Sequence, residues 1–224
     1  MKPKDLIYPF PFKERRLLSE NGIFYLPDHL DCYEGFDPGL PLNEKKVFVE
    51  FCSGNGEWIL QKARENPEMQ FIAVEKLFFR IQKIVSRREN LGIKNLFIVS
   101  GNIHNLLKYY LPENSIDHLA INFPDPWPKD RHVKHRLFHE PFVRQIERAL
   151  KEGGDLYLVT DDAPYSDWVE NAVRESLFSS QKESLSDRIP GYGSSFFQRL
   201  WEFKGKKIFY HHYAKRSLCL TPVS

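Results

Sequence analysis

Cysteine is scarce in this 224-residue sequence, which contains only Cys32, Cys52 and Cys219. Because the count is odd and the spacings are wide, neither a disulfide framework nor a metal-binding cysteine cluster is indicated. No stretch approaches the ~20 consecutive apolar residues of a membrane helix, and the N-terminus lacks the apolar core of a signal peptide. We therefore expect a soluble protein of a reducing, cytoplasmic setting, with no membrane partner.

Excess charge of one sign is also missing. The 32 lysines and arginines are balanced by 30 aspartates and glutamates, so the net charge is +2 and any cationic patch must be local. The eight histidines form no metal-site pattern. His211 and His212 are neighbours in a predicted strand and point to opposite faces, and no Cys or carboxylate completes a site with His132, His135 and His139. We expect no metal.

Two nucleotide-binding fingerprints are absent as well. The sequence after the first predicted strand, 50–56, is Glu-Phe-Cys-Ser-Gly-Asn-Gly, without the glycine triplet of a dinucleotide fold and without the lysine of a P-loop. Gly54 and Gly56 still permit a tight turn and close backbone approach to a ligand. Glu75 follows the next strand, about 20 residues later, where an acid can accept hydrogen bonds from ribose hydroxyls. This spacing serves both NAD and S-adenosylmethionine, and the missing triplet disfavours NAD.

What the sequence does contain is an alternation of apolar strands and amphipathic helices, which predicts a doubly wound, mostly parallel α/β sheet with antiparallel C-terminal strands. The 42% of hydrophobic residues suffices for one large core. Strands are expected over 46–51, 71–75, 95–99, 116–123, 155–160 and 207–213, and helices over 56–66, 77–91, 104–110 and 140–150. Residues 1–44, rich in proline, are expected to form an irregular N-terminal arm with a short helix near Lys13 to Glu20.

Ligands of such sheets bind at the carboxyl ends of the strands. This rule places the 50–56 turn, Glu75, Asn102, Asp125 and Asp161 along one edge of the sheet. Asn102 either contacts an adenine edge or caps the local backbone. Asp161 either binds a polar ligand or caps the following helix.

The most informative motif is Phe-Pro-Asp-Pro-Trp at 123–127. Its two prolines fix the backbone around Asp125 in a stiff, non-helical form. A run of cations with interleaved histidines follows, and it suits phosphates and bases or is simply a solvated basic face. Trp127 either packs beneath this loop or stacks on a base. A later segment, Ser195 to Gln198, is expected to be a loop before the C-terminal strands whose polar ends reach the same edge.

Together these residues resemble the bacterial tRNA (guanine-N7-)-methyltransferase family over roughly residues 45 to 215, above all in the Phe-Pro-Asp-Pro-Trp motif and its Lys/Arg/His run. The resemblance implies a Rossmann-like, S-adenosylmethionine-dependent methyltransferase domain at 45–224. It also implies methyl transfer to N7 of a guanine in tRNA, in the variable loop at position 46 of that RNA. A monomer and a homodimer are both compatible with the sequence.

The resemblance assigns roles residue by residue. Asp125 is implied as the catalytic residue. The implied S-adenosylmethionine site consists of Glu50, Gly54, Gly56, Glu75, Asn102 and Asp125. The implied substrate contacts are Lys129, Asp161, Ser195, Phe196, Phe197 and Gln198. The implied tRNA contacts are Arg131, His132, Lys134, His135 and Arg136.

Some positions depart from the family pattern. Cys52 stands where the family usually has the first glycine of its turn, and Asn102 replaces the usual Asp. Ser195 and Gln198 replace Thr and Glu, and a neutral Gln accepts through one oxygen and also donates. These departures leave a noncatalytic tRNA-binding module as one alternative. A nucleotide-dependent oxidoreductase on the same fold is a second, and a small-molecule methyltransferase is a third, in which the basic run has no role.

Overall fold

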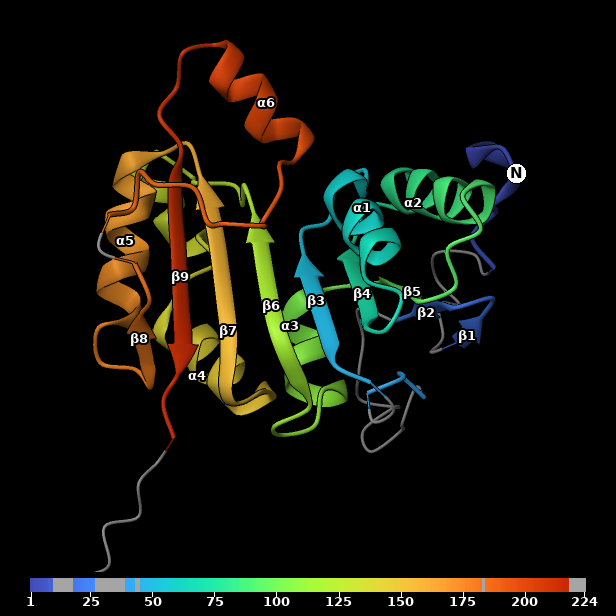
Figure 1. Cartoon of the computed structure of the whole chain (residues 1–224), viewed down its shortest axis with the longest axis horizontal. Helices are drawn as coiled ribbons and strands as arrows, with labels where there is room; N and C mark the ends of the chain where they lie inside the picture. The colour runs from blue at the N-terminus through green and yellow to red at the C-terminus, as the bar shows by residue number, and fades with distance from the viewer. Residues whose placement is uncertain (10–17, 27–38, 43–44, 183, 218–224) are drawn as a thin grey trace, which may run out of the picture.

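The computed structural model describes residues 1–9, 18–26, 39–42, 45–182 and 184–217. Its described strands form one nine-stranded sheet in the order β1-β2-β5-β4-β3-β6-β7-β9-β8. The strands from β2 to β7 run parallel, whereas β1, β9 and their pairings are antiparallel. The doubly wound, mostly parallel sheet with antiparallel C-terminal strands is therefore confirmed (Figure 1).

The strands that carry this sheet are short, and the central ones are buried on both faces. They are β3 (Val47–Phe51), β4 (Gln70–Glu75), β5 (Leu96–Ser100), β6 (Ile116–Asn122), β7 (Leu150–Thr160), β8 (Phe178–Ser180) and β9 (Phe209–Lys215). Alternate side chains of β4 enter opposite cores: Ile72 and Val74 pack into one, Phe71 and Ala73 into the other. This period-two burial fixes the register of the sheet.

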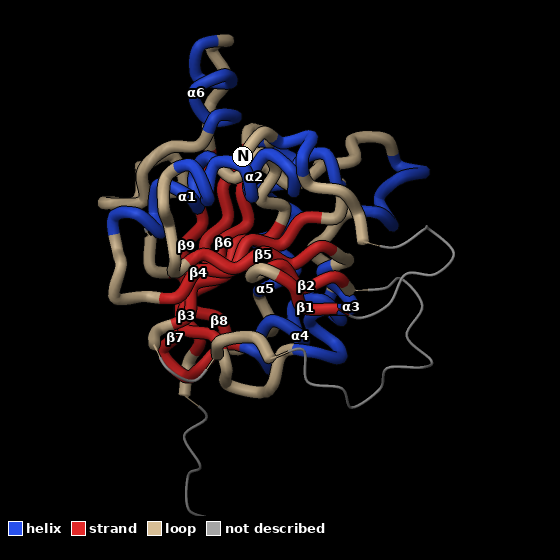
Figure 2. Tube along the Cα trace, turned by 90° about the vertical axis from the view of Figure 1, so that its right-hand side faces the viewer, coloured by secondary structure: helices blue, strands red, loops and turns tan. Residues whose placement is uncertain are grey.

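Helices cover both faces. On one face lie α1 (Glu57–Glu65) and α2 (Phe78–Asn90), which pack Ile59 and Ile84 against the sheet. On the other face lie α4 (Glu140–Ala149) and α5 (Ala163–Val173), together with the short turn α3 (Ile103–Asn105) and the π-helical turn η3 (Leu106–Tyr110). Figures 1 and 2 show one more helix, α6 (Phe196–Phe203), standing off the body above the carboxyl ends of the strands.

The N-terminal arm is less irregular than the sequence predicted. After a 3-10 turn η1 (Pro3–Asp5), β1 (Leu18–Glu20) and β2 (Ile23–Tyr25) form a hairpin. Strand β2 is buried and pairs with β5, so the arm extends the sheet. The helix expected near Lys13 to Glu20 is wrong for residues 18–20, which form a strand; its other residues lie outside the described part. Strand pairing overrides local helix propensity here.

Two further boundaries differ from expectation. Helix α4 ends at Ala149, and β7 begins at once at Leu150 instead of after the glycines, with a register shift opposite β6. The segment from Ser195 was expected as a loop, but it forms α6. Among the described residues, no helix is long and apolar enough to cross a membrane, and no group of three or more His, Cys, Asp or Glu is arranged to hold a metal ion.

Candidate active site

The turn after β3 is shaped by three left-handed residues. Cys52, Gly54 and Gly56 have φ angles of 58°, 57° and 72°, a region that glycine adopts freely and other residues rarely do. A Cβ on Gly56 would lie 2.7 Å from Cγ1 of Ile84, whereas one on Gly54 would make only ordinary contacts, with the carbonyl oxygen of Cys52 at 3.9 Å and Cε2 of Phe197 at 4.0 Å. Gly56 therefore permits close packing against α2. Gly54 is the glycine that faces the candidate ligand space.

Glu75 ends β4 and holds this turn. Its Oε2 accepts a hydrogen bond from the backbone N–H of Gly54 at 2.9 Å, and its Oε1 accepts from the N–H groups of Lys76 and Leu77 at 2.9 and 3.0 Å. Arg80 lies 3.5 Å away as an ion-pair partner. A carboxylate offers about four acceptor sites, so three backbone bonds leave capacity for one more donor. Glu75 is thus part of the scaffold of the turn and still able to accept from a ligand.

Glu50, at the end of β3, is 2% exposed. Its Oε1 accepts a hydrogen bond from Nδ2 of Asn122 at 2.8 Å, and Oδ1 of Asn122 accepts from the hydroxyl of Tyr192 at 3.0 Å. Its Oε2 has no hydrogen-bond partner among the described residues. Burial raises the pKa of Glu50 to about 8, against the opposing effect of the Asn122 hydrogen bond.

A pocket joins this turn to α6. One side, which we call the sheet wall, consists of Glu50, Ser53, Gly54 and Asn122. The other side, the helix wall, consists of Ser195, Phe196 and Phe197. Cys52, Asn55, Glu57 and Trp58 also line it. Two segments that the sequence singled out separately, 140 residues apart, therefore form one hollow.

The thiol of Cys52 is not a reactive group here. Burial raises its pKa to about 12, and the negative charges of Glu75, Asp125 and Glu50 act in the same direction. A thiol that keeps its proton at neutral pH is a poor nucleophile. Cys52 therefore contributes shape to the pocket, in a backbone conformation that usually favours glycine.

The motif at 123–127 forms an irregular loop between β6 and the 3-10 helix η4 (Asp130–His135). Phe123 and Trp127 have left-handed φ angles of 51° and 44° on either side of Asp125. Asp125 is exposed. The ring of Phe123 lies 6.4 Å from that of Phe197, centroid to centroid, so this loop adjoins the helix wall.

The basic run folds back on the motif. The ring of Trp127 lies 5.5 Å from that of His132 and 5.2 Å from that of His135. Trp127 is 36% exposed, so it is not packed beneath the loop. Arg136 donates through Nε to the carbonyl of Pro126 at 3.0 Å and lies over the ring of Trp168. Arg136 thus anchors the loop, whereas the remaining cations, Lys129, Arg131 and Lys134, are exposed.

Asp161 forms an ion pair with Lys206, from the segment that follows α6. The capping alternative for Asp161 is wrong. The N-cap of α5 is its neighbour Asp162, whose Oδ1 accepts a hydrogen bond from the N–H of Tyr165 at 2.8 Å. Asn102 does cap a turn: its Oδ1 accepts from the N–H of His104 at 2.9 Å.

The polar ends of the Ser195–Gln198 segment build α6. The Ser195 hydroxyl accepts from the N–H of Gln198 at 3.2 Å and caps the helix. Gln198 is 1% exposed, and its Nε2 donates to the hydroxyl of Tyr210 at 2.8 Å and to Glu202 at 3.1 Å. Between these anchors, Phe196 and Phe197 remain exposed at the pocket.

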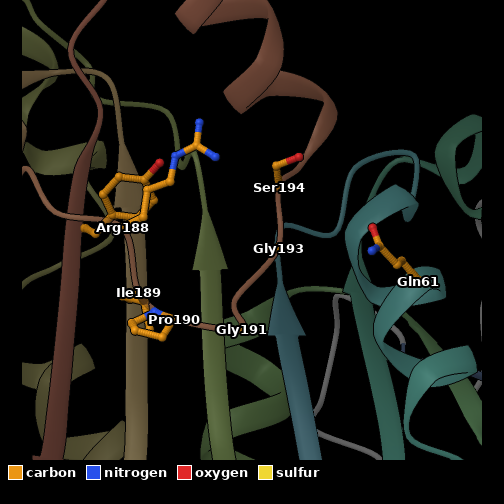
Figure 3. A pocket seen from close by; sticks show the side chains of 8 residues that line it. Gln61, Arg188, Ile189, Pro190, Gly191, Gly193 and Ser194 are labelled. Atoms are coloured by element: carbon orange, nitrogen blue, oxygen red, sulfur yellow. The ribbon is translucent and has the colours of Figure 1, made fainter.

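A second hollow lies along the segment that leads into α6. Figure 3 shows this segment descending from Arg188 to Gly191 and then rising to Ser194, with Gln61 of α1 on the opposite side. No residue predicted as functional lines it. Two hydrogen bonds hold this segment against α1: Nζ of Lys62 donates to the carbonyl of Gly191 at 2.5 Å, and Nε1 of Trp58 donates to the carbonyl of Tyr192 at 2.8 Å. The hollow therefore marks the path of the segment that carries Tyr192 to the pocket.

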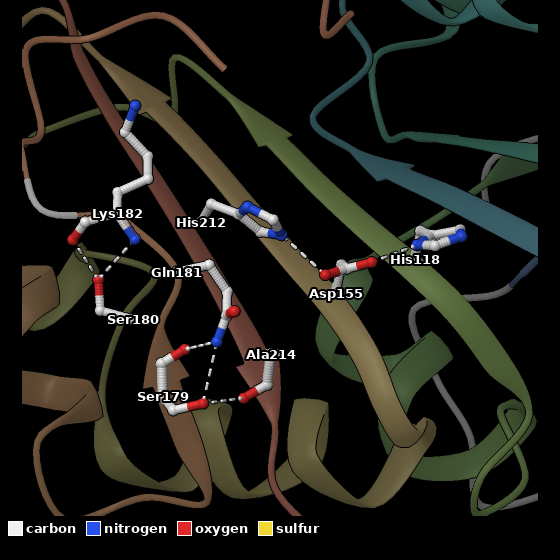
Figure 4. A network of polar contacts seen from close by, with 8 residues as sticks. All are labelled: His118, Asp155, Ser179, Ser180, Gln181, Lys182, His212 and Ala214. Atoms are coloured by element: carbon white, nitrogen blue, oxygen red, sulfur yellow. Dashed lines mark hydrogen bonds and ion pairs between the residues drawn. The ribbon is translucent and has the colours of Figure 1, made fainter. Parts of the chain in front are cut away.

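A cluster of polar side chains lies on the face of the sheet (Figure 4). Asp155 accepts hydrogen bonds from His118 at 2.9 Å and from His212 at 2.7 Å. Although burial opposes it, the hydrogen bonds and charges of the two imidazoles hold the pKa of Asp155 well below its usual range. The cluster ties β6, β7 and β9 together.

Sequence reasoning missed Asn122, which belongs to the sheet wall, and Tyr192, which supports it. Asn122 immediately precedes the motif, and Tyr192 lies 70 residues further along. Asn122 was included only as the end of a strand, although it falls at the carboxyl edge where ligands bind. Tyr192 carried no local signal.

Comparison with known proteins identifies the family to which this chain belongs. A family model described as "Putative methyltransferase" matches residues 44–210. A tRNA (guanine-N(7)-)-methyltransferase of Chlamydia muridarum is 40% identical over 221 residues, covering 96% of this chain and 99% of the relative. The chain belongs to this family. The tRNA (guanine-N(7)-)-methyltransferase of Chlamydia felis is 38% identical over 222 residues, again covering 96% of this chain and 98% of the relative.

Solved structures agree on the fold of this family member. The 16S rRNA methyltransferase KamB superposes with a TM-score of 0.58 and 14% sequence identity, covering 77% of this chain and 89% of that one. At this identity the likeness concerns the fold alone. The Rossmann-like methyltransferase architecture expected from the sequence is thereby confirmed.

Proposed function

We propose that this protein transfers the methyl group of S-adenosylmethionine to N7 of a guanine in tRNA, in the variable loop at position 46. Family membership supports the reaction. The structural observation that carries it is the pocket, which is lined both by the aromatic start of α6 and by a buried carboxylate, one oxygen of which has no partner among the described residues. A nucleotide-dependent oxidoreductase has no support in the relatives, which are methyltransferases.

The sheet wall fits the cofactor chemically. A buried carboxylate oxygen without a partner is costly unless a donor or cation meets it, and S-adenosylmethionine carries both an ammonium and a sulfonium. We assign its binding to Glu50, Gly54, Glu75 and Asn102, the last through the part of its amide not used in capping. Gly56 acts indirectly, because its missing side chain lets α2 approach the turn.

The chemistry asks little of the protein beyond positioning. N7 of a neutral guanine carries a lone pair and no proton, so no general base is needed. When bound, the cofactor supplies an activated methyl group on a sulfonium. The protein must align the acceptor and exclude water, which contributes several kcal/mol, on the order of ten in favourable cases. Asp125 either stabilises the positive charge that develops on the methylated ring or accepts hydrogen bonds from guanine N1 and N2.

The helix wall is assigned to the base. Phe196 and Phe197 offer exposed rings beside Phe123, and base stacking on such rings is worth about 1–3 kcal/mol. Gln198 is buried and engaged, so we propose that Ser195 and Gln198 serve the substrate by holding α6. Asp161 can meet the guanine only if it shares or releases Lys206.

The tRNA backbone is assigned to the exposed cations at the motif. Lys129, Arg131 and Lys134, with His132 and His135 beside Trp127, form a cationic and aromatic surface next to the helix wall. We propose that Arg136 contributes mainly by fixing this surface. The substrate also makes the cytoplasm the proposed place of action.

The test is methylation of unmodified tRNA transcripts with labelled S-adenosylmethionine, wild type beside Asp125→Asn, with the product mapped by cleavage at 7-methylguanine. We expect a single variable-loop product and a loss of about 100-fold or more in the variant, without loss of folding because Asp125 is exposed. Binding of tRNA without methylation of any transcript would instead support the noncatalytic module suggested by Cys52, Asn102 and Gln198.

A further inference from the structure

Three side chains from distant parts of the chain form a buried chain of hydrogen bonds at the pocket. The Tyr192 hydroxyl donates to Oδ1 of Asn122, and Nδ2 of Asn122 donates to Oε1 of Glu50, at 3.0 and 2.8 Å. All three residues are less than 8% exposed. The second carboxylate oxygen, Oε2, has no partner among the described residues. One oxygen of Glu50 is thus fixed and the other is left for a ligand.

The direction of the two hydrogen bonds depends on how the amide of Asn122 is oriented. An amide can present either its oxygen or its nitrogen to a neighbour. An ionised Glu50 carboxylate can only accept, so it requires the amide nitrogen. The Tyr192 hydroxyl remains protonated, since burial raises its pKa well above the usual value, and it can therefore donate to the amide oxygen on the other side. The flipped amide would place its oxygen against the carboxylate and leave a buried donor and acceptor mismatched.

Tyr192 is itself held from outside the pocket. Its carbonyl accepts from Nε1 of Trp58, and its ring lies 4.8 Å from that of Trp58 and 5.4 Å from that of Tyr157. Three residues later the same segment becomes Ser195, the cap of α6. The segment that carries the helix wall therefore also orients the carboxylate of the sheet wall.

We propose that Asn122 and Tyr192 are positioning residues that hold the Glu50 carboxylate with one oxygen free for the cationic end of the cofactor. This rests on the proposed cofactor, and neither residue needs to touch it. A hydrogen bond from a neutral amide favours the ionised carboxylate. Removing that bond should disfavour the form that binds a cation.

The ionisable groups around Glu50 are few. They are Cys52 on its own turn, Glu75 at the end of β4, Glu57 at the start of α1, and Tyr192. Cys52 and Tyr192 keep their protons at neutral pH. Glu75 opposes ionisation of Glu50 by its charge. The cations next to these groups, Arg80 and Arg199, are paired with Glu75 and Glu57. Loss of the Asn122 donor should therefore move the titration of Glu50 upward in pH.

The test compares Tyr192→Phe and Asn122→Leu with Tyr157→Phe. The control, Tyr157→Phe, removes a hydroxyl from the same aromatic cluster. Both Tyr→Phe substitutions keep the packing of the ring. Two quantities are measured for each protein after its folding has been verified. The first is the titration of Glu50 in the free protein, followed by the NMR signal of a ¹³C-labelled carboxyl group. The second is the affinity for S-adenosylmethionine between pH 6 and 9.

We expect the midpoint of the Glu50 titration and the midpoint of the pH dependence of affinity to move to higher pH in Tyr192→Phe, and further in Asn122→Leu. The affinity for S-adenosylmethionine at pH 7 should fall about threefold in Tyr192→Phe and about tenfold or more in Asn122→Leu. The turnover number at saturating cofactor should stay near that of wild type, and Tyr157→Phe should move neither midpoint. Unchanged midpoints in both variants, with only a lower melting temperature, would overturn the proposal. A wild type that binds no S-adenosylmethionine would overturn the proposed function instead, and the Glu50 titration would still decide the positioning roles.

Discussion

The two walls of the pocket are stabilised in different ways. Glu50 and Asn122 of the sheet wall are 2% and 7% exposed and end central strands of the sheet. Phe196 and Phe197 of the helix wall are 48% and 36% exposed. The helix that carries them is attached by the surface ion pairs Arg199–Glu57 and Arg188–Glu202 and by the buried amide of Gln198.

This difference suggests a division of labour. A site built on strand ends is preorganised at no further cost when the ligand arrives. Surface ion pairs contribute only about 0.2–1 kcal/mol each, so the helix wall can shift to admit a large substrate. We therefore expect changes in the sheet wall to affect the cofactor, and changes in the helix wall and the basic run to affect tRNA.

The largest effect should come from Glu50→Gln. Losing the charge of a buried ion pair costs several kcal/mol, so affinity for S-adenosylmethionine should fall by about 100-fold or more. Titration calorimetry measures this change. Retention of wild-type affinity would show that the sheet wall is not the cofactor site.

The same variant should be more stable than wild type at alkaline pH. Burial raises the pKa of Glu50 from 4.5 to about 8, so the folded protein binds the extra proton and its free energy of unfolding falls as pH rises through this interval. Glutamine avoids that loss, on the order of 4 kcal/mol at pH 8. Thermal unfolding at pH 5 and pH 8 should show the gain only at the higher pH.

The next effect concerns the substrate side. Arg131→Gln combined with Lys134→Gln should weaken tRNA binding about tenfold and lower the slope of log affinity against log salt by about 1.5, because two phosphate contacts are lost. The matched control is Arg64→Gln combined with Lys94→Gln. These residues lie in the last turn of α1 and just before β5, at the edge of the sheet opposite to the carboxyl ends of the strands. Equal slopes for the two pairs would remove the basic run from the interface.

A smaller effect is expected from Gln198→Ala. It removes the buried hydrogen bond to the Tyr210 hydroxyl, which costs about 1 kcal/mol of stability. The KM for tRNA should rise several-fold while affinity for the cofactor is unchanged. Phe203→Ser, on the same helix but 89% exposed, should leave the melting temperature as it is. Parallel losses in both affinities would contradict separate walls.

The smallest effect is expected from Arg199→Met, which breaks the exposed pair with Glu57. Chemical denaturation should detect a change of about 0.2–1 kcal/mol. A loss of several kcal/mol would mean that α6 is fixed to α1 much more firmly than a surface ion pair allows.

Much of the fold could be predicted because strand burial leaves a strong pattern. The apolar runs that became β3, β4 and β5 were predicted to within one residue at each boundary. The N-terminal hairpin was missed although Asn21-Gly22, both with positive φ, is a strong turn signal between its strands. Helix α6 was missed although Ser-x-x-Gln at 195–198 matches the start of a capped helix.

The site was less predictable where it depends on pairs far apart in sequence. The edge rule placed Glu50, Glu75 and Asp161 at the carboxyl edge of the sheet from their strands alone. It could not show that Tyr192 forms a hydrogen bond with Asn122, or that Lys206 forms an ion pair with Asp161. Both contacts depend on the path of the segment around α6. Single-sequence patterns report which face a residue takes, and they carry no information on such partners.

The most direct test of the proposed reaction is to change the acceptor atom. A tRNA with 7-deazaguanosine at the variable-loop guanine keeps the shape and pairing edge of the base but has carbon in place of N7. We predict that this tRNA binds with wild-type affinity and accepts no methyl group, while the unmodified tRNA is labelled. Equal labelling of both tRNAs would contradict methyl transfer to N7.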